Sequence, residues 1–394
     1  MKNTSFNEVK EKSEKYLFHN YGRIDLSFVR GQGCYLYDTE GTKYLDLVAG
    51  IAVNSIGYTH PDWVKAVQEQ AMKMAHVSNL YYVEQQADLA ERIAAITPGD
   101  IGKTLFVNSG AEANEAALKM AVKYTGRHKV MSALNGFHGR TSASLGATGQ
   151  TKYQSGFEPL ISDAYEYYEY GNPESVKKMI TKDVAAVMVE PIQGEGGVIT
   201  APAEFFKTVR DLCTDSGALM IVDEVQTGIG RTGEWFGIDN FGVVPDAVTM
   251  AKALGGGVPI GALATTDEFA ATMTPGTHGT TFGGSPLVCT AACATLDIMN
   301  RENLVQNSKD VGAKWRENIS AIGSDRIVDV RGYGLMIGVE MDSSETASMV
   351  QKKCRENAVL VNVAHGKTIR LIPPLIITEE QTDVFTDLLK DALC

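Results

Sequence analysis

The clearest indication of fold class lies in the segment Ala218-Leu219-Met220-Ile221-Val222-Asp223-Glu224-Val225-Gln226. Its first five residues are apolar, which is the length of a buried strand, and Asp223 follows directly. Open parallel α/β sheets bind ligands at the carboxyl ends of their strands, so this acid lies where a ligand is expected. A carboxylate there can hold a cationic ring nitrogen, or it can be a structural acid paired with an arginine or a helix cap. The segment alone leaves both interpretations open.

Similar apolar segments alternate with amphipathic helices on both sides of this strand. The other predicted strands are Thr104–Val107, Lys129–Ala133, Val184–Val189 and Ala247–Met250, and the predicted helices are Ala111–Tyr124 and Ala203–Ser216. Fully apolar strands that alternate with helices indicate a parallel sheet with both faces covered. The chain is therefore expected to be an α/β protein.

The pattern changes toward the two ends of the chain. At the N-terminal end, residues 1–20 are expected to form a polar arm or helix, followed by a hairpin of Tyr35–Tyr37 with Lys43–Leu47 and a helix at Asp62–His76. Toward the C-terminus, the predicted helices are Thr290–Ser308 and Val311–Ile322. The predicted strands Arg326–Val330 and Met336–Glu340 follow them, and a final helix ends the chain. The change of rhythm after Thr290 predicts a second, smaller α+β lobe.

The composition excludes several classes of protein. The 394 residues include 36 Lys and Arg against 48 Asp and Glu, so a basic face that grips nucleic acid is not expected. No apolar run approaches the roughly 18–20 residues of a membrane span, and the polar N-terminus has no secretory signal, which favours a cytoplasmic location. The six cysteines are expected to be reduced thiols, and no metal site is expected because no Cys/His spacing fits zinc.

An anion site is predicted where the strand Thr104–Val107 ends. A turn at Ser109 leads into a helix, and Ser109 and Glu112 have the spacing of a capping box. The small residues Gly110 and Ala111 let an anion approach the free N–H groups of the helix N-terminus, where the helix dipole also favours a phosphate. An ordinary capped helix is the alternative.

A reactive lysine is predicted at Lys252, which stands between apolar residues and just before Gly255-Gly256-Gly257. Burial lowers the pKa of a lysine because it disfavours the charged form, and Schiff-base formation requires the neutral amine. The three glycines leave room for a ring. A surface lysine that extends its charge into water is the alternative.

Together, an anion cradle, an acid for a ring nitrogen and a buried lysine are the parts of a pyridoxal-phosphate site. The segment Asn135–Thr141 adds Phe137, which can stack on a planar cofactor, and Arg140, which can grip a carboxylate with two hydrogen bonds. Core packing of Phe137 and a surface ion pair of Arg140 are the simpler alternatives.

A competing motif is Gly228-Ile229-Gly230-Arg231-Thr232-Gly233, which has the G-x-G-x-x-G spacing of dinucleotide-binding proteins. That fingerprint makes a tight turn from a strand directly into a helix. Here Asp223–Thr227 intervene and no helical periodicity follows. A nicotinamide-dependent dehydrogenase is therefore kept only as a remote alternative.

The chain as a whole resembles the class III pyridoxal-phosphate aminotransferases. The motifs that carry the resemblance are Gly50–Asn54 with His60-Pro61, Asn108–Glu115, Phe137–Thr141, Glu190–Gly197, Asp223–Gly228, Lys252, His278–Gly284, Arg331–Leu335 and Arg370 before Pro373-Pro374. The resemblance implies the aspartate-aminotransferase-like fold, fold type I, with a large, mostly parallel seven-stranded domain. It also implies a small α+β domain made from both chain ends. The implied boundaries are 1–57 and 294–394 for the small domain and 58–293 for the large, cofactor-binding domain.

The resemblance further implies a set of cofactor-binding residues, which is Ser109, Gly110, Ala111, Phe137, Asp223, Glu224, Val225, Gln226, Lys252 and Thr281. Lys252 would hold the cofactor covalently, and Asp223 would pair with its pyridinium nitrogen. Gln226 would contact the phenolic oxygen, and Phe137 would stack on the ring. The three residues at the helix start would bind the phosphate, which Thr281 would reach from the neighbouring subunit of a homodimer.

A second set of residues would bind the substrates. Arg140, with Thr280 close by, would bind a substrate carboxylate. Glu195 would mask Arg370 while the amino donor is bound and release it for the carboxylate of 2-oxoglutarate or glutamate. The implied partners are thus a small amino donor and 2-oxoglutarate, with no nucleic acid and no membrane.

The expected donor is N2-acetylornithine, which would give N-acetylglutamate 5-semialdehyde and glutamate in arginine synthesis. Gly50 favours this donor, because ornithine δ-aminotransferases carry a tyrosine there and a glycine leaves space for an N-acyl group. Three departures from the family pattern, Gly136, Thr280 and Ser285, affect the pocket without removing a catalytic group. N-succinyldiaminopimelate, ornithine, a carrier-bound lysine and 4-aminobutyrate remain open as donors, and a non-enzymatic relative is a further alternative.

Overall fold

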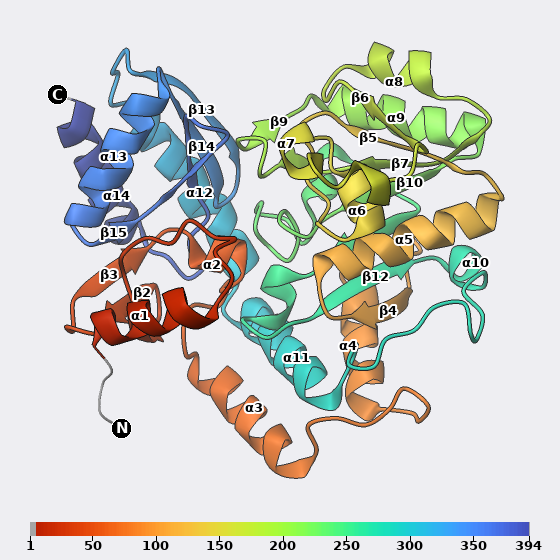
Figure 1. Ribbon diagram of the computed structural model, residues 1–394, viewed down its shortest axis with the longest axis horizontal. Coiled ribbons are helices and arrows are strands. Elements are labelled where there is room, and N and C mark those ends of the chain that lie inside the picture. Colours follow the sequence, from red (N-terminus) through yellow and green to blue (C-terminus); the bar gives the residue numbers. More distant parts are fainter. Residues whose placement is uncertain (1–4, 394) are drawn as a thin grey trace.

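The apolar runs of the sequence form the middle of a seven-stranded sheet in the computed structural model, which describes residues 5–393 (Figure 1). The strands, in their order across the sheet, are β4 (Lys103–Val107), β12 (Gly261–Thr265), β11 (Ala247–Met250), β10 (Leu219–Asp223), β7 (Val184–Val189), β5 (Lys129–Ala133) and β6 (Tyr165–Tyr168). Only β12 runs antiparallel to its neighbours. The prediction of a large, mostly parallel α/β sheet is therefore confirmed.

Both faces of this sheet are buried, as fully apolar strands predict. In β10, Met220 and Val222 belong to one hydrophobic cluster, while Leu219 and Ile221 point to the other face and belong to a second. The helices of this domain are α4 (Glu84–Ala94), α5 (Gly110–Thr125), α6 (Ser142–Ala147), α7 (Thr151–Gln154), α8 (Pro173–Met179), α9 (Ala203–Ser216) and α10 (Asp267–Ala270). The helix α5 packs on β11 and β12, and α9 packs on β7 and β10.

The small domain joins segments from both ends of the chain, which lie on the same side of Figure 1. One sheet contains β1 (Phe28–Gln32), β2 (Tyr35–Asp38), β3 (Lys43–Asp46) and β15 (Val359–Leu360), and the other contains β13 (Ile327–Tyr333), β14 (Met336–Met341), β17 (Thr368–Leu371) and β16 (Asn362–Ala364). Its helices are α12 (Leu304–Ser320), α13 (Ser344–Glu356) and α14 (Glu379–Leu393). The parallel pairing of β3 with β15 ties the two ends of the chain together.

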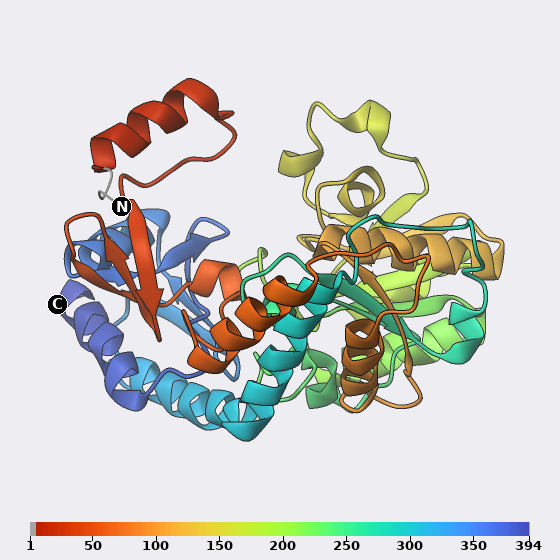
Figure 2. The same cartoon turned by 90° about the horizontal axis from the view of Figure 1, so that it is seen from below.

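Three N-terminal helices and one long helix lie outside these layers. The helix α1 (Phe6–Tyr16) has no buried residue and stands apart from the small domain (Figure 2). The helix α3 (Pro61–Lys73) contacts α11 (Pro286–Arg301), which runs between the two domains. The short segment α2 (Ala49–Ala52) has positive φ angles throughout, so it is a left-handed turn rather than an ordinary helix.

Some predicted boundaries were wrong. The helix expected to end at Ser308 is two helices, because α11 ends at Arg301 and α12 begins at Leu304. The break lies at Asn303, whose φ of 54° ends the helical path without a glycine or proline to mark it. The G-x-G-x-x-G segment is a series of turns with no helix at its end, so it lacks the geometry of a dinucleotide site.

The described cysteines, Cys34, Cys213, Cys289, Cys293 and Cys354, are free thiols. Cys394 lies outside the described residues, as do residues 1–4 of the predicted N-terminal arm. Within residues 5–393, no group of three or more His, Cys, Asp or Glu side chains is arranged to hold a metal ion. No helix in the same range is long and apolar enough to cross a membrane.

Candidate active site

A cavity of ≈ 460 Å³ opens at the carboxyl ends of the central strands. It brings together most of the predicted site residues, which are Ser109, Gly110, Ala111, Phe137, Arg140, Glu195, Asp223, Val225, Gln226 and Lys252. These residues come from the loops that follow β4, β5, β10, β11 and the two-residue strand β8 (Ile192–Gln193). The cavity therefore lies where ligands bind in open α/β sheets.

The start of α5 forms one end of the cavity. The Ser109 hydroxyl caps the helix by accepting a hydrogen bond from the Glu112 N–H at 3.2 Å. The first-turn N–H groups of Gly110 and Ala111 have no acceptor inside the helix, so they are available to an anion. A Cβ on Gly110 would lie 2.7 Å from the side chain of Val225, which explains why a glycine occupies this position.

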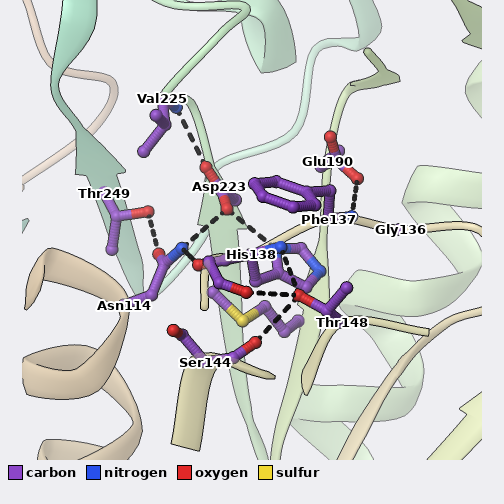
Figure 3. A network of polar contacts seen from close by, with 12 residues as sticks. Asn114, Gly136, Phe137, His138, Ser144, Thr148, Glu190, Asp223, Val225 and Thr249 are labelled. Carbon is purple, nitrogen blue, oxygen red and sulfur yellow. Dashed lines mark hydrogen bonds and ion pairs between the residues drawn. The ribbon is translucent and has the colours of Figure 1, made fainter. Parts of the chain in front are cut away.

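Asp223 lines the cavity and is held by a network of hydrogen bonds (Figure 3). Its Oδ2 accepts hydrogen bonds from Asn114 Nδ2 at 2.8 Å and from His138 at 2.7 Å, and its Oδ1 accepts one from the Val225 N–H at 3.0 Å. Asn114 is oriented in turn by Thr249, whose hydroxyl donates to Asn114 Oδ1 at 2.6 Å. This arrangement keeps the carboxylate fixed and ready to hold a cation.

His138 is the partner of Asp223 that sequence reasoning missed. Its side chain is fully buried, and its Nδ1 faces Asp223. Burial alone would lower the pKa of His138, but the hydrogen bond to Asp223 and the charges of Asp223 and Glu190 outweigh burial and raise it. The only available sequence signal was the position of His138 between Phe137 and Arg140, two residues that were already assigned to the site.

Lys252 follows β11 and lies half-buried in the cavity wall. Its φ of 41° places the backbone in the left-handed region, which costs energy in a residue other than glycine. Burial lowers the pKa of Lys252 to about 8, with the charge of Glu195 and other carboxylates opposing this shift and the charge of Arg370 acting in the same direction as burial. A neutral amine is therefore accessible close to neutral pH.

Glu195 and Arg370 form an ion pair across the two domains. Arg370 Nη1 donates to Glu195 Oε1 at 2.6 Å and to Gln226 Oε1 at 3.1 Å, and Arg370 Nε donates to Asn362 Oδ1 at 3.0 Å. Arg370 is only 1% exposed. Burial alone would raise the pKa of Glu195, but the charge and hydrogen bond of Arg370 outweigh burial and lower it.

Phe137 and Arg140 lie together at the cavity rim. The ring centroids of Phe137 and Tyr153 are 5.4 Å apart in an edge-on arrangement, and the Arg140 guanidinium lies 4.9 Å from the Tyr153 ring. Arg140 forms no salt bridge with a carboxylate of residues 5–393. Its charge is therefore free to meet an anionic ligand.

Other predicted site residues lie outside the cavity lining. Glu224 turns away from the cavity and accepts hydrogen bonds from the Gly237 and Ile238 N–H groups, at 2.9 and 2.8 Å. Thr280 lies in a neighbouring hollow, where its hydroxyl accepts a hydrogen bond from Asn108 Nδ2 at 3.0 Å. Thr281 is exposed next to it. Arg370 reaches the cavity only through its bonds to Glu195 and Gln226.

Comparisons with known proteins identify the family of this site. The family model for class-III aminotransferases matches residues 16–393. An acetylornithine aminotransferase of Archaeoglobus fulgidus is 47% identical to this chain, and the match covers 95% of this chain and 97% of that protein. An acetylornithine aminotransferase of Methanosarcina mazei is 45% identical, and the match covers 98% of this chain and 96% of that protein. Among solved structures, an ornithine aminotransferase from Toxoplasma gondii has a TM-score of 0.94 at 30% identity, covering 99% of this chain and 95% of that chain. An acetylornithine aminotransferase from Elizabethkingia anophelis has a TM-score of 0.87 at 32% identity, with 99% of both chains covered.

Proposed function

Since this chain belongs to the class-III aminotransferases, a pyridoxal-phosphate-dependent family, we propose that it transfers the terminal amino group of N2-acetylornithine to 2-oxoglutarate. The products are N-acetylglutamate 5-semialdehyde and glutamate, and in arginine synthesis the reaction runs toward N2-acetylornithine. The observation that carries this proposal is the 47% identity, over nearly the full length of both chains, with a relative named for that activity.

The donor set of the cavity fits the cofactor. The N-terminus of α5 offers N–H groups for a phosphate, and the glycine at 110 keeps that approach open. Asp223 offers a fixed carboxylate for a protonated ring nitrogen, and Lys252 offers an amine of lowered pKa for covalent attachment. Phe137 stands beside this space and gives a ring face to a planar group.

In the proposed mechanism, the cofactor, Asp223 and Lys252 each have a separate chemical role. The bound cofactor supplies an electron sink for the carbon that carries the amino group. Asp223 keeps the proton on the ring nitrogen through its fixed carboxylate. Lys252 would use its Nζ as general base to take the proton from the donor carbon and as general acid to return it.

Glu195 and Arg370 are proposed to distinguish the two half-reactions. While the ion pair is closed, the buried charge of Arg370 is neutralised, and a donor without a carboxylate at its reacting end fits beside it. When 2-oxoglutarate or glutamate binds, Arg370 exchanges Glu195 for the carboxylate nearer the reacting carbon. Arg140, which is free at the rim, holds the far carboxylate in both cases.

Two features support an acylated donor. Gly50 lies in the exposed left-handed turn of α2, and Val53 just after it lines the cavity. A glycine with φ of 65° fits this backbone without strain, and a Cβ there would lie 3.1 Å from Asn54 Nδ2, so the glycine keeps this turn beside the cavity small. N-succinyldiaminopimelate fits the same argument and is the second candidate donor.

A homodimer in the cytoplasm is part of the proposal. Large apolar side chains are exposed beside Thr280 and Thr281, and they are Leu80, Tyr81, Tyr82 and Phe282. Such a patch is typical of a subunit interface. We expect Thr281 of one subunit to reach the phosphate bound by the other.

The proposal is tested by a half-reaction. The cofactor-loaded protein is mixed with one amine and no keto acid, and the absorbance of the bound cofactor is followed. We expect rapid loss of the yellow band with N2-acetylornithine and slow loss with ornithine or 4-aminobutyrate. Equal rates with N-succinyldiaminopimelate would add a second donor. No response to either acylated amine would contradict the proposed substrate.

A further inference from the structure

Glu190 is a buried carboxylate of the cavity without a cationic partner. It follows β7 and is 7% exposed. Its oxygens accept hydrogen bonds from the Phe137 N–H at 3.0 Å and the Gly194 N–H at 3.4 Å. No Lys or Arg of residues 5–393 forms a salt bridge with it. A buried carboxylate in this position favours a protonated form or a shared proton.

His138 has an unpaired nitrogen that faces the same region (Figure 3). Its Nδ1 is bonded to Asp223, while its Nε2 is buried without a hydrogen-bond partner among the described residues. A Cβ built on Gly136 would lie 3.3 Å from His138 Nε2 and 3.4 Å from Glu190 Oε2. The nitrogen and the oxygen therefore border one small space, which the glycine at 136 leaves open.

We propose that Glu190 is a positioning residue for the acid partner of the cofactor, because its carboxylate and the His138 imidazole, which border the space beside Gly136 without a direct hydrogen bond, compete through their charges for one proton. When the proton is on Glu190, His138 is neutral and Asp223 offers its full charge to the ring nitrogen. When the proton is on His138, the imidazolium competes with the ring nitrogen for the same carboxylate. The inference rests on the proposed role of Asp223.

The electrostatics of the surroundings support this coupling between Glu190 and His138. Burial raises the pKa of Glu190 to about 7, while the charge of His138 opposes that rise. The pKa of His138 is raised by Asp223 and Glu190 despite burial, so the two groups titrate as a coupled pair. The other ionisable groups that face Glu190 are Tyr168, Tyr170 and Lys252. Burial raises the pKa of both tyrosines well above the usual value, so both stay neutral, and the covalent link to the cofactor engages the lysine.

The test replaces Glu190 by glutamine in the cofactor-loaded protein. The Glu190→Gln side chain still accepts from the Phe137 N–H but carries no charge. Nitrogen-15 NMR of labelled histidines reports the titration of His138, and absorbance reports the titration of the bound cofactor. We expect the midpoint of His138 to fall by at least about one pH unit and the absorbance profile to shift with it. An unchanged midpoint for His138 would overturn the proposal.

Gly136 provides a second test that leaves Glu190 in place. Gly136→Ser adds a hydroxyl that donates to His138 Nε2, while the matched control Gly136→Ala adds the same Cβ without the hydroxyl. The backbone at Gly136 does not have a positive φ, but a Cβ there would lie 3.0 Å from the Ala133 carbonyl oxygen and 3.3 Å from His138 Nε2, so both variants crowd the site equally and only the hydroxyl distinguishes them. We expect the serine variant to lower the midpoint of His138 by more than the alanine variant does. Equal effects of the two variants would also overturn the proposal.

These tests are separable from the test of the proposed function. A protein whose His138 titrates as expected, but which transaminates none of the amines, would contradict the proposed function. It would still support the coupling between Glu190 and His138. A protein that transaminates N2-acetylornithine, but whose His138 does not respond to either variant, would contradict the pair alone.

Discussion

At the residue scale, Lys252 has three properties that fit the covalent cofactor link proposed for it. It lies half-buried in the cavity, its backbone is in the left-handed region, and its amine has a lowered pKa. The residues that flank it, Ala251 and Ala253, are buried, so the side chain is the polar part of this segment that reaches the cavity. These properties make the attachment of the cofactor dependent on pH near neutrality.

The first prediction concerns that pH dependence. When cofactor-free protein is mixed with pyridoxal phosphate, the rate of covalent attachment should rise with pH and level off above a midpoint near about 8, because only the neutral amine reacts. A midpoint near the ordinary lysine value of 10.5 would contradict the burial argument. Glu195→Gln should move the midpoint lower, because the negative charge of Glu195 raises the pKa of Lys252.

Single residues were predictable from the sequence where their local context was unusual. Asp223 ends an apolar strand, Ser109 precedes a helix, and Lys252 stands before three glycines, so each could be assigned a chemical role. His138 and Glu190 could not, because their surroundings depend on hydrogen bonds between distant segments, from His138 to Asp223 85 positions later and from the Phe137 N–H to Glu190 53 positions later. Glu224 was expected in the site from the family resemblance, but its side chain turns away from the cavity and accepts hydrogen bonds from the Gly237 and Ile238 N–H groups.

At the element scale, the strand β4 and the helix α5 build the anion site. The strand pairs with β12, and the glycine that begins β12 lies so close to Ser109 that a Cβ there would overlap its backbone. The turn at Ser109 then directs the first N–H groups of α5 into the cavity. The site therefore depends on close backbone packing as much as on side chains.

The second prediction concerns this helix start. Gly110→Ala puts a Cβ 2.7 Å from the Val225 side chain, and such overpacking costs about 1–3 kcal/mol. We expect cofactor affinity to fall roughly five- to 150-fold, as measured by fluorescence titration of the cofactor-free protein. Gly102→Ala is the matched control, because its Cβ has no neighbour nearer than 4.0 Å. Equal affinity in both variants would contradict the anion-site assignment.

Elements were predictable where a pattern was strong. The central strands β5, β7, β10 and β11 and the helices α5 and α9 lie within a residue or so of their predicted positions. The strands β6 and β12 were missed, because Tyr165–Tyr168 mixes aromatic and acidic residues and Gly261–Thr265 is short and rich in small residues. The pairing partners of β12 depend on contacts that local pattern does not encode.

At the scale of the whole molecule, the cavity depends on both domains. Glu195 comes from the large domain, while Arg370 lies on β17 of the small domain, 175 positions later. Composition and periodicity indicated two lobes, but they could not predict that the side chains of Glu195 and Arg370 pair with each other. That pairing was expected only from the family resemblance, and the structure contains the ion pair at 2.6 Å.

The central claim is that one cavity assembles a pyridoxal-phosphate site around Lys252. Its most direct test is borohydride reduction of the purified yellow protein followed by peptide mapping with mass spectrometry. We expect the reduced cofactor on the peptide that contains Lys252 and on no other, and we expect its absence from a Lys252→Ala variant treated in the same way. A labelled lysine elsewhere in the chain, or a protein that binds no cofactor, would contradict the assignment.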